Sequence, residues 1–364
     1  MHLFPTLSAY IARHFLASFL AFLGIVAGLI WILDTIELLR RAADKPGATL
    51  GIVLKMGLYK LPETGQIVLP FIVLFAAMFA LWRLTRSHEL VVARASGVSA
   101  WQFLLPMLAV ALLMGLVTTT VINPAAATLV SRYEHMENRY LKGRVSSLNV
   151  SKYGLWLRQP YADGHALIHA ENMDLHALTL NHVMVLFFRG EDTYAGRLDA
   201  PAATLQDGLW KLQDVLVNIP GRTPEHRQAY SLPTVFTLDR IQESFAPPAT
   251  LSFWELPRFI GIIENTGLSS LRHRMHFHSL LAQPLLFCAM VLLAAIFTPH
   301  STRRGGVLSM IIGGIVAGFA LYMIRNIASA FGSAGSVPPF MAAWSPTVAS
   351  LLLGTAALLQ KEDG

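Results

Sequence analysis

Six long apolar segments limit what this chain can fold into. Three of them lie before about Ile122 and three follow about His278, with a more polar stretch between the two groups. A transmembrane helix needs about 20 apolar residues, and each segment supplies most of that length. The chain is 54% hydrophobic and only 14% charged, whereas soluble domains carry about 25% charged residues. The sequence therefore predicts a polytopic α-helical membrane protein with six transmembrane helices.

The boundaries of the spans follow from apolar runs and helix-breaking residues. The predicted spans are residues 15–33, 67–82, 101–122, 279–297, 307–324 and 341–359. We expect an amphipathic segment at 7–14 to lie along the interface before the first span. The pair Asn123-Pro124 indicates a stop at the end of the third span.

The side of the membrane is predicted from the cations near the span ends. Six spans put both termini on the same side. The pairs Arg83/Arg86 and Arg303/Arg304 favour the cytoplasm for that side, since positive charge accumulates there. The polar middle of the chain is then expected outside the cytoplasm.

The middle of the chain changes to the period of β-strands. Strands are predicted at 145–151, 154–159, 166–171, 182–188, 194–205, 210–219 and 234–238. Turn signals at Gly164, Gly190, Gly208 and Gly221 separate several of them. Short strands at this spacing favour an antiparallel sandwich or jelly roll. Helices are expected on either side, at 125–140 and 254–264, with a break at Gly267.

These elements predict three parts of the chain. Residues 1–124 hold the first three transmembrane helices and a cytoplasmic helix at about 85–98. Residues 125–270 form an all-β, jelly-roll-like domain with flanking helices. Residues 271–364 hold the last three transmembrane helices.

The loop between the second and third spans predicts a short helix of its own. Ser87 is a good N-cap, Glu89 suits the positive end of a helix dipole, and Gly97 is placed to end the helix. In one interpretation this helix docks into a partner protein, with Glu89 and Arg94 available to pair with charges there. In the other it is an interfacial helix that only links two spans.

Basic residues gather on the predicted outer side. They are Arg40, Arg41 and Lys45 after the first span and Arg325 near the end of the fifth. Arginine and lysine bind phosphate well, so an anionic lipid headgroup is a candidate ligand. The alternative is local pairing with Asp34 and Glu37. A charge at Arg325 is costly unless it is paired or faces a polar cavity.

Small residues indicate where helices approach closely. Gly24 and Gly28 lie four apart in the first span, as do Gly314 and Gly318 in the fifth. This spacing permits close helix packing. Spans one and five are therefore expected to make helix contacts, within the chain or with another subunit.

Several site types are disfavoured by the sequence. No P-loop, His-Glu-x-x-His or Gly-x-Ser-x-Gly motif occurs, and the net charge of +6 comes without a basic stripe interleaved with aromatics, so no nucleic-acid partner is predicted. His273, His276 and His278 are interpreted as an interfacial cluster rather than a metal site. The spans hold almost no carboxylates, so the energy for any work is expected from a partner.

A specific resemblance emerges from several motifs. They are Leu-Pro-Glu-Thr-Gly-Gln-Ile-Val-Leu-Pro from Leu61, Arg-Ser-His-Glu-Leu-Val-Val-Ala-Arg-Ala-Ser-Gly-Val-Ser from Arg86, the stretch 272–284, Arg-Arg-Gly-Gly from Arg303, and Pro338-Pro339 to Ala-Trp-Ser-Pro at 343–346. These resemble the LptF/LptG permease family over nearly the whole chain. The start at Tyr10-Ile11 and the Asp34 region resemble the LptG branch more than the LptF branch.

The resemblance implies a subunit of a lipopolysaccharide exporter in the bacterial inner membrane. Its partners would be an LptF-like permease, an LptB ATPase dimer and LptC, with ATP and Mg bound by the ATPase and no cofactor in this chain. Lipopolysaccharide would leave the outer leaflet for a periplasmic β-jellyroll bridge. The resemblance also implies roles for particular residues: ATPase coupling for the helix that contains Ser87, Glu89, Leu90, Arg94 and Gly97. Arg40 and Arg41 match the family's basic cluster approximately, and Arg325 matches its span-five arginine; with Lys45, these are the predicted substrate-binding residues.

Two other classes of function remain open from the sequence. One is an enzyme that modifies a lipid at the outer face, although no catalytic set is visible near a span end. The other is a membrane scaffold without transport activity. Copurification of a soluble ATPase would separate the transport subunit from both.

Overall fold

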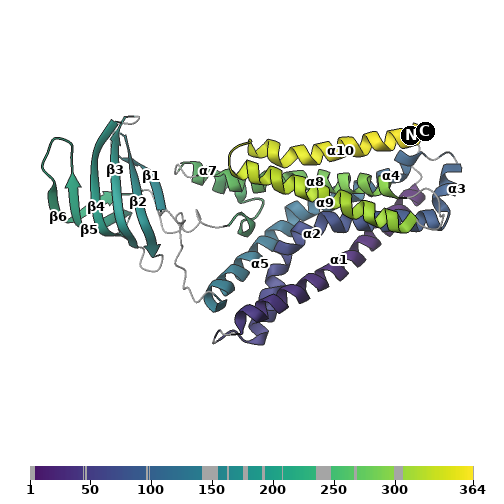
Figure 1. Ribbon diagram of the computed structural model, residues 1–364, viewed down its shortest axis with the longest axis horizontal. Helices are drawn as coiled ribbons and strands as arrows, with labels where there is room; N and C mark the ends of the chain where they lie inside the picture. Colours follow the sequence, from purple (N-terminus) through teal and green to yellow (C-terminus); the bar gives the residue numbers. More distant parts are fainter. Residues whose placement is uncertain are drawn as a thin grey trace. The chain divides into compact units, whose positions relative to one another are not determined.

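Two structural units make up the chain (Figure 1). The first comprises Met1–Glu134, Pro248–Leu256 and Leu271–Gly364 and holds the long helices; the second comprises His135–Pro247 and Pro257–Ser270 and holds the β-strands. This computed structural model describes residues 5–43, 45, 47–95, 97, 99–141, 155–161, 164–174, 179–190, 193–206, 208–234, 247–265, 269–298 and 306–363.

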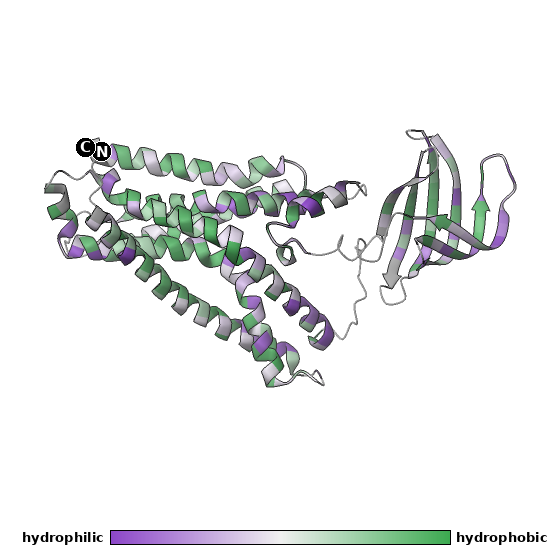
Figure 2. Cartoon of the chain, turned by 180° about the vertical axis from the view of Figure 1, so that it is seen from behind, coloured by the Kyte–Doolittle hydropathy of each residue, from purple (hydrophilic) through white to green (hydrophobic). Residues whose placement is uncertain are grey.

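Among the described residues, six helical stretches are long and apolar enough to cross a membrane, as predicted. They are Thr6–Ala42, Leu50–Arg86, Ala100–Leu141, Leu271–Phe297, Val307–Ser333 and Pro339–Gln360. The helices are α1 (Pro5–Ala42), α2 (Leu50–Arg86), α4 (Ala100–Val117), α5 (Asn123–Met136), α8 (Leu271–Phe297), α9 (Gly306–Ser333) and α10 (Pro339–Asp363). Figure 2 shows them apolar along most of their length.

The first two helices are longer than the predicted spans. Residues 7–14 belong to the same helix as the first span, since no glycine or proline separates them. The second helix begins at Leu50 rather than near 67 and contains Pro62 and Pro70. Proline is tolerated in membrane helices because neighbouring helices satisfy the backbone groups that it frees. The predicted span was too short because a search for apolar residues does not detect the polar turns that extend a helix beyond the hydrocarbon layer.

The predicted stop at Asn123-Pro124 is wrong. Helix α4 continues through a π-helical turn, η1 (Thr118–Ile122), into α5 and the π-helical η2 (Glu137–Leu141). The π-helical turn, with its wider i to i+5 hydrogen bonds, lies just before Pro124. Proline is tolerated there although it lacks the N–H that a helix interior requires. The buried Asn123 side chain also accepts a hydrogen bond from the Phe253 amide at 2.8 Å. Asn123 thus anchors the turn instead of ending the helix.

Helix α8 forms the centre of the helical unit. It packs against α2, α4, α9 and α10, whereas α1 packs along α2 and α4. Of the most apolar stretch of α8, 67% is buried, against 6% for α1. Two shorter helical segments lie in the connection before α8, η3 (Pro248–Thr250) and α7 (Leu256–Asn265).

The second unit contains one antiparallel sheet in which the described strands follow chain order. They are β1 (Leu155–Tyr161), β2 (Gly164–Asp174), β3 (Thr179–Arg189), β4 (Thr193–Gln206), β5 (Leu209–Asn218) and β6 (Glu225–Pro233). Side chains of all six strands share one apolar core that includes the fully buried Trp210. The inserted antiparallel β domain is therefore confirmed.

The sheet bends until its first and last strands approach each other. Gln159 of β1 is buried, and its Nε2 donates to the Pro233 carbonyl at 2.8 Å while its Oε1 accepts from the Thr234 hydroxyl at 2.7 Å. The hydroxyls of Tyr161 and Tyr230 lie 3.5 Å apart on the same two strands. Among the described strands, this curvature rather than a second sheet encloses the core.

Five of the predicted strands coincide with β1 to β5. Strand β6 was not predicted, because its side chains are mostly exposed and polar and lack the apolar alternation that marks a half-buried strand. Gly190, Gly208 and Gly221 have positive φ angles, as the turn signals require. The predicted strand 145–151, the predicted strand 234–238 beyond Thr234, and the predicted break at Gly267 lie outside the described residues.

Candidate functional site

A seven-residue helix, α3 (Glu89–Ala95), lies between α2 and α4. Gly97 follows it with a φ of 87°, a left-handed conformation that glycine adopts without steric cost. The prediction that Gly97 ends this helix is confirmed. Ser99 then begins α4 with a capping box, its hydroxyl accepting from the Gln102 amide at 3.2 Å.

Ser87 does not cap α3, and that part of the prediction is wrong. It is the C-cap of α2, and its hydroxyl lies 3.1 Å from the Arg83 carbonyl and 3.3 Å from the Leu84 carbonyl. His88 separates the two helices in a left-handed conformation with a φ of 59°. The tight turn at His88 leaves Ser87 on the preceding helix, because unpaired carbonyls at a helix end attract a hydroxyl donor.

Glu89 connects the short helix to the start of α1. The Tyr10 hydroxyl donates to Glu89 Oε1 at 3.3 Å, and the Tyr10 and His14 rings pack edge to face at 4.3 Å. Leu90 is half-buried against the apolar core of the helical unit. The side chain of Arg94 lies outside what the structure describes. Helix α3 is thus connected to α1 through a side-chain hydrogen bond and to α2 through the chain.

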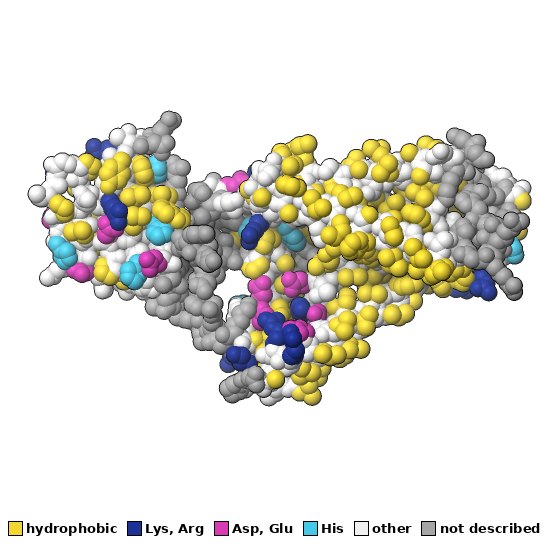
Figure 3. All heavy atoms as spheres, viewed as in Figure 1, with side chains coloured by type: hydrophobic (Ala, Val, Ile, Leu, Met, Phe, Trp, Pro, Cys, Tyr) yellow, Lys and Arg dark blue, Asp and Glu magenta, His cyan; other side chains and the backbone are white. Residues whose placement is uncertain are grey.

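Charged side chains gather where α1 and α2 meet (Figure 3). Lys60 of α2 pairs with Asp34 of α1 at 2.7 Å, and the Thr64 hydroxyl donates to the same carboxylate at 3.2 Å. Arg40 pairs with Glu37 at 2.9 Å, and its side chain is 77% exposed. Local pairing therefore accounts for the conformation of Arg40, while its exposure leaves it accessible to another anion.

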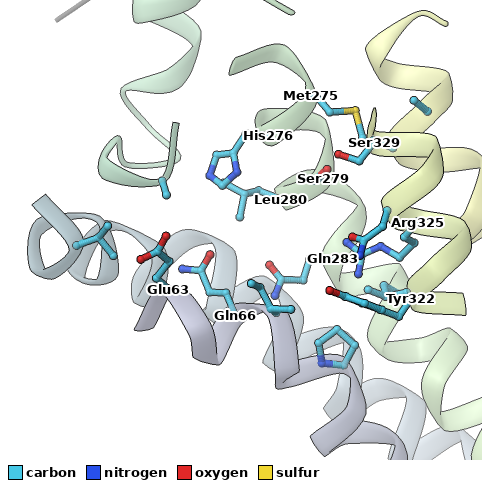
Figure 4. Close-up of a pocket in the computed structure, with 18 residues that line it drawn as sticks. Glu63, Gln66, Met275, His276, Ser279, Leu280, Gln283, Tyr322, Arg325 and Ser329 are labelled. Atoms are coloured by element: carbon cyan, nitrogen blue, oxygen red, sulfur yellow. The ribbon is translucent and has the colours of Figure 1, made fainter. Parts of the chain in front are cut away.

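A polar pocket of about 360 Å³ lies within the helical unit. Helices α2, α8 and α9 supply most of its lining, with Glu63 and Gln66 from α2, His276 and Gln283 from α8, and Tyr322 and Arg325 from α9 (Figure 4). No residue of α1 lines it. The structure therefore does not bring Arg325 into one site with Arg40, Arg41 and Lys45.

The two glycine pairs have different surroundings. A Cβ at Gly314 would lie 2.5 Å from the Met78 sulfur, and one at Gly318 would lie 3.0 Å from a Leu74 methyl, so both pack on α2. Cβ atoms at Gly24 and Gly28 would meet nothing within 4 Å. The glycines of span five serve a contact with α2, and those of span one lie on an open face of the chain.

A second cavity, of about 500 Å³, opens at one end of the bent sheet. Tyr161, Phe187, Ile219 and Tyr230 form much of its wall. Burial, and then the hydrogen bond with Tyr161, raise the pKa of Tyr230 to about 12. At neutral pH this wall is therefore uncharged at Tyr230, and it combines aromatic side chains with the cations Arg189 and Arg197.

The comparisons with known proteins agree with this arrangement. A family profile described as the lipopolysaccharide export system permease LptF/LptG matches residues 9–360. The chain belongs to the LptF/LptG family. It is 24% identical over 374 residues to the lipopolysaccharide export system permease protein LptG of Escherichia coli K12, covering 99% of this chain and 100% of that protein. It is 23% identical over 364 residues to the protein of the same name from Haemophilus influenzae, covering 98% and 99%.

The family resemblance seen in the motifs is thus confirmed, with relatives that carry the LptG name. Membership in the LptF/LptG family, together with six spanning helices, makes this chain a multi-pass membrane permease subunit rather than an enzyme. The roles of the individual coupling and binding residues stay predictions.

Sequence reasoning missed most of the pocket of this LptF/LptG chain. Gln66, Gln283 and Tyr322 were not singled out, although Gln283 is a polar residue in the middle of an apolar span. Polar residues inside spans are uncommon and usually face a protein interior or cavity. That signal, applied to amides as well as to charges, would have indicated the pocket.

Proposed function

We propose that this chain is the LptG-like permease subunit of an ATP-driven exporter of lipopolysaccharide. It would extract the lipid from the outer leaflet of the inner membrane and pass it to a periplasmic β-jellyroll bridge. The observation that carries the proposal is the family match over residues 9–360. An LptB ATPase dimer would hydrolyse ATP, and an LptF-like permease and LptC would complete the assembly.

Helix α3 is the proposed contact with the ATPase. It is short, it connects two spanning helices, and Glu89 and Leu90 stand in its first turn. In the proposed orientation it faces the cytoplasm, where LptB binds nucleotide. A push on α3 would be transmitted to α2 through the turn at His88 and to α1 through Tyr10.

The open surfaces of α1 and α9 are proposed to face the second permease and the substrate. Both helices carry many exposed large apolar side chains, including Ile25, Leu29, Val316 and Phe319. Such surfaces need lipid or protein against them. Two similar subunits joined along these helices would enclose a cavity between them.

The predicted outer side would receive the lipid. Arg40, Arg41 and Lys45 would contact its phosphates, because arginine and lysine side chains suit that ligand. Acyl chains would then enter the β unit at the cavity whose wall includes the aromatic residues Tyr161, Phe187 and Tyr230. The β unit is proposed to lie in the periplasm.

Reconstitution tests this function. The chain, copurified with its subunits and placed in proteoliposomes with lipopolysaccharide, is expected to release that lipid to a soluble jelly-roll acceptor only when ATP is supplied. An ATPase-dead companion subunit provides the control. ATP-independent release, or turnover of a lipid by the isolated chain, would overturn the proposal.

A further inference from the structure

One face of α9 changes character along its length. Positions 314, 318, 322, 325 and 329 follow a helical spacing and lie toward α2 or the polar pocket. The glycines at the first two positions let α2 approach closely, with Met78 and Leu74 against them. From Tyr322 onward the same face carries larger polar side chains, and there the pocket opens.

The pocket concentrates polar groups that have no protein partner. Within the described part of the chain, no hydrogen bond or ion pair is made by the side chains of Gln66, Ser279, Gln283, Tyr322, Arg325 or Ser329, all of which line it. His276 Nε2 is also buried there without a partner among these residues. Gln283 and His276 Nε2 are buried, and the other five side chains are half-buried. Polar groups inside a protein are nearly always hydrogen-bonded, so this set suits an occupant with several donors and acceptors.

The charges of the pocket lie at its two ends. Figure 4 places Glu63 on α2 at one end and Arg325 on α9 at the other, with Gln66 and Gln283 between them. No carboxylate among the described residues lies within ion-pair distance of Arg325. A cation inside a membrane span is costly without a counter-charge. The arrangement suits a ligand that carries a negative group at one end and a positive group at the other.

We propose that this pocket binds a zwitterionic phosphoethanolamine headgroup. Arg325 would hold the phosphate through its guanidinium fork. Glu63 would accept from the ammonium, since a carboxylate has about four acceptor positions and can serve more than one donor. The amides of Gln66 and Gln283 would bond the phosphate ester oxygens.

The sign of the charges favours a zwitterion over a plain anion. Glu63 would repel an anionic headgroup that filled the pocket, whereas it adds attraction for an ammonium group. A choline headgroup lacks N–H donors and could not hydrogen-bond the carboxylate. Apolar lining from Ile67, Pro70 and Leu286 would accompany the glycerol backbone. The proposal does not depend on lipopolysaccharide export.

Native mass spectrometry of the purified full-length chain tests this proposal. The probes are dioleoyl phosphatidylethanolamine, phosphatidylglycerol and phosphatidylcholine, each titrated separately. The wild-type chain is expected to bind the ethanolamine lipid about tenfold more tightly than the other two lipids. The other two lack the hydrogen-bonded ammonium contact to Glu63, and a tenfold difference corresponds to about 1.4 kcal/mol. R325Q should weaken all three lipids, because each carries the phosphate that Arg325 is proposed to hold. E63Q should weaken only the ethanolamine lipid, and R272Q, which removes an exposed arginine from α8, should change none of the three.

Additional probes identify the source of the headgroup. Soluble O-phosphoethanolamine should compete if the headgroup alone supplies the affinity, and phosphoethanolamine-bearing lipopolysaccharide should compete if its headgroup reaches the same pocket. If R325Q does not fold, E63Q still tests the proposal: its preference for the ethanolamine lipid over the glycerol lipid should be smaller than that of the wild-type chain. Retention of all three lipids at equal strength, or a preference for phosphatidylglycerol that E63Q leaves unchanged, would overturn the proposal.

Discussion

Helices α1 and α8 are both long and apolar, but they occupy opposite environments. Of the most apolar stretch of α8, 67% is buried by other parts of the chain, whereas the corresponding value for α1 is 6%. Ile25 on α1 is 70% exposed, while Phe287 on α8 is fully buried. Apolar composition therefore predicts membrane insertion but not which helix forms the core. The exposed face of α1 must meet lipid or another protein.

Small residues explain how α8 becomes buried. A Cβ at Gly115 of α4 would collide with the backbone of Pro284, and one at Gly354 of α10 would lie 2.9 Å from Leu292. Neighbours can thus approach α8 on more than one side. The glycines of α1, Gly24 and Gly28, meet nothing in this chain. Glycines on α4 and α10 thus support the packing around α8, whereas the glycines of α1 contact nothing within the chain.

The largest expected effect follows from filling the contact beside α8. G115V should destabilise the helical unit by about 3 kcal/mol, because the new side chain meets Pro284 backbone that cannot move aside easily. Thermal unfolding in detergent measures this loss, with G28V as the matched control on α1. Equal stability of G115V and the wild-type chain would show that the α4–α8 contact is looser than described.

The second expected effect concerns assembly rather than folding. The double variant G24V/G28V should leave the unfolding temperature of the isolated chain unchanged, since both positions are open. If α1 packs on the second permease, recovery of that subunit should fall about tenfold, which corresponds to about 1.4 kcal/mol of lost association energy. Undiminished recovery would assign this face of α1 to lipid.

The third prediction separates two roles of Glu89, the first residue of α3, whose side chain contacts Tyr10 near the start of α1. E89A should reduce ATPase copurification, and E89Q should also do so if the negative charge makes the contact. Y10F should leave the ATPase bound but lower export per ATP several-fold, because it removes the hydrogen bond to Glu89, a contact of about 1 kcal/mol. Y59F is the control. If Y10F loses the ATPase as well, Tyr10 serves docking and not transmission.

A smaller effect is expected at the other end of α1. Charge reversal in the double variant R40E/R41E should reduce crosslinking to a phosphorylated lipid several-fold, because it replaces attraction with repulsion. E37Q serves as a control that releases Arg40 from its partner and should not lower crosslinking. Unchanged crosslinking in the reversed variant would leave local pairing as the whole role of Arg40.

The smallest effect is predicted for α9. G314A should cost about 1 kcal/mol, because the added methyl meets the flexible end of Met78 rather than backbone. Comparison with G115V in the same unfolding assay tests whether the loss of stability is larger when the added atoms meet backbone than when they meet a flexible side chain. A loss as large as that of G115V would show that α2 is as constrained as α8.

The sequence predicted the helices well where the apolar pattern alone decided them. The six spans, the short helix ended by Gly97 and five strands follow from periodicity and turn residues. It failed at Asn123-Pro124, because a π-turn and the contact from Asn123 to the Phe253 amide are tertiary effects. It also grouped Arg325 with Arg40, Arg41 and Lys45, whereas Arg325 lines a pocket with residues of α2 and α8. Those residues are far apart in the sequence, so their proximity could not be predicted. The burial of α8 over α1 could not be predicted from two equally apolar runs.

The proteins that copurify with the tagged chain, and their stoichiometry, decide whether this chain is a transport subunit. We expect one second permease and two copies of a soluble ATPase per chain, with ATP hydrolysis that responds to lipopolysaccharide and depends on Glu89. A chain recovered alone that acts on a lipid without ATP, or residues 155–234 found accessible only from the cytoplasm, would contradict it.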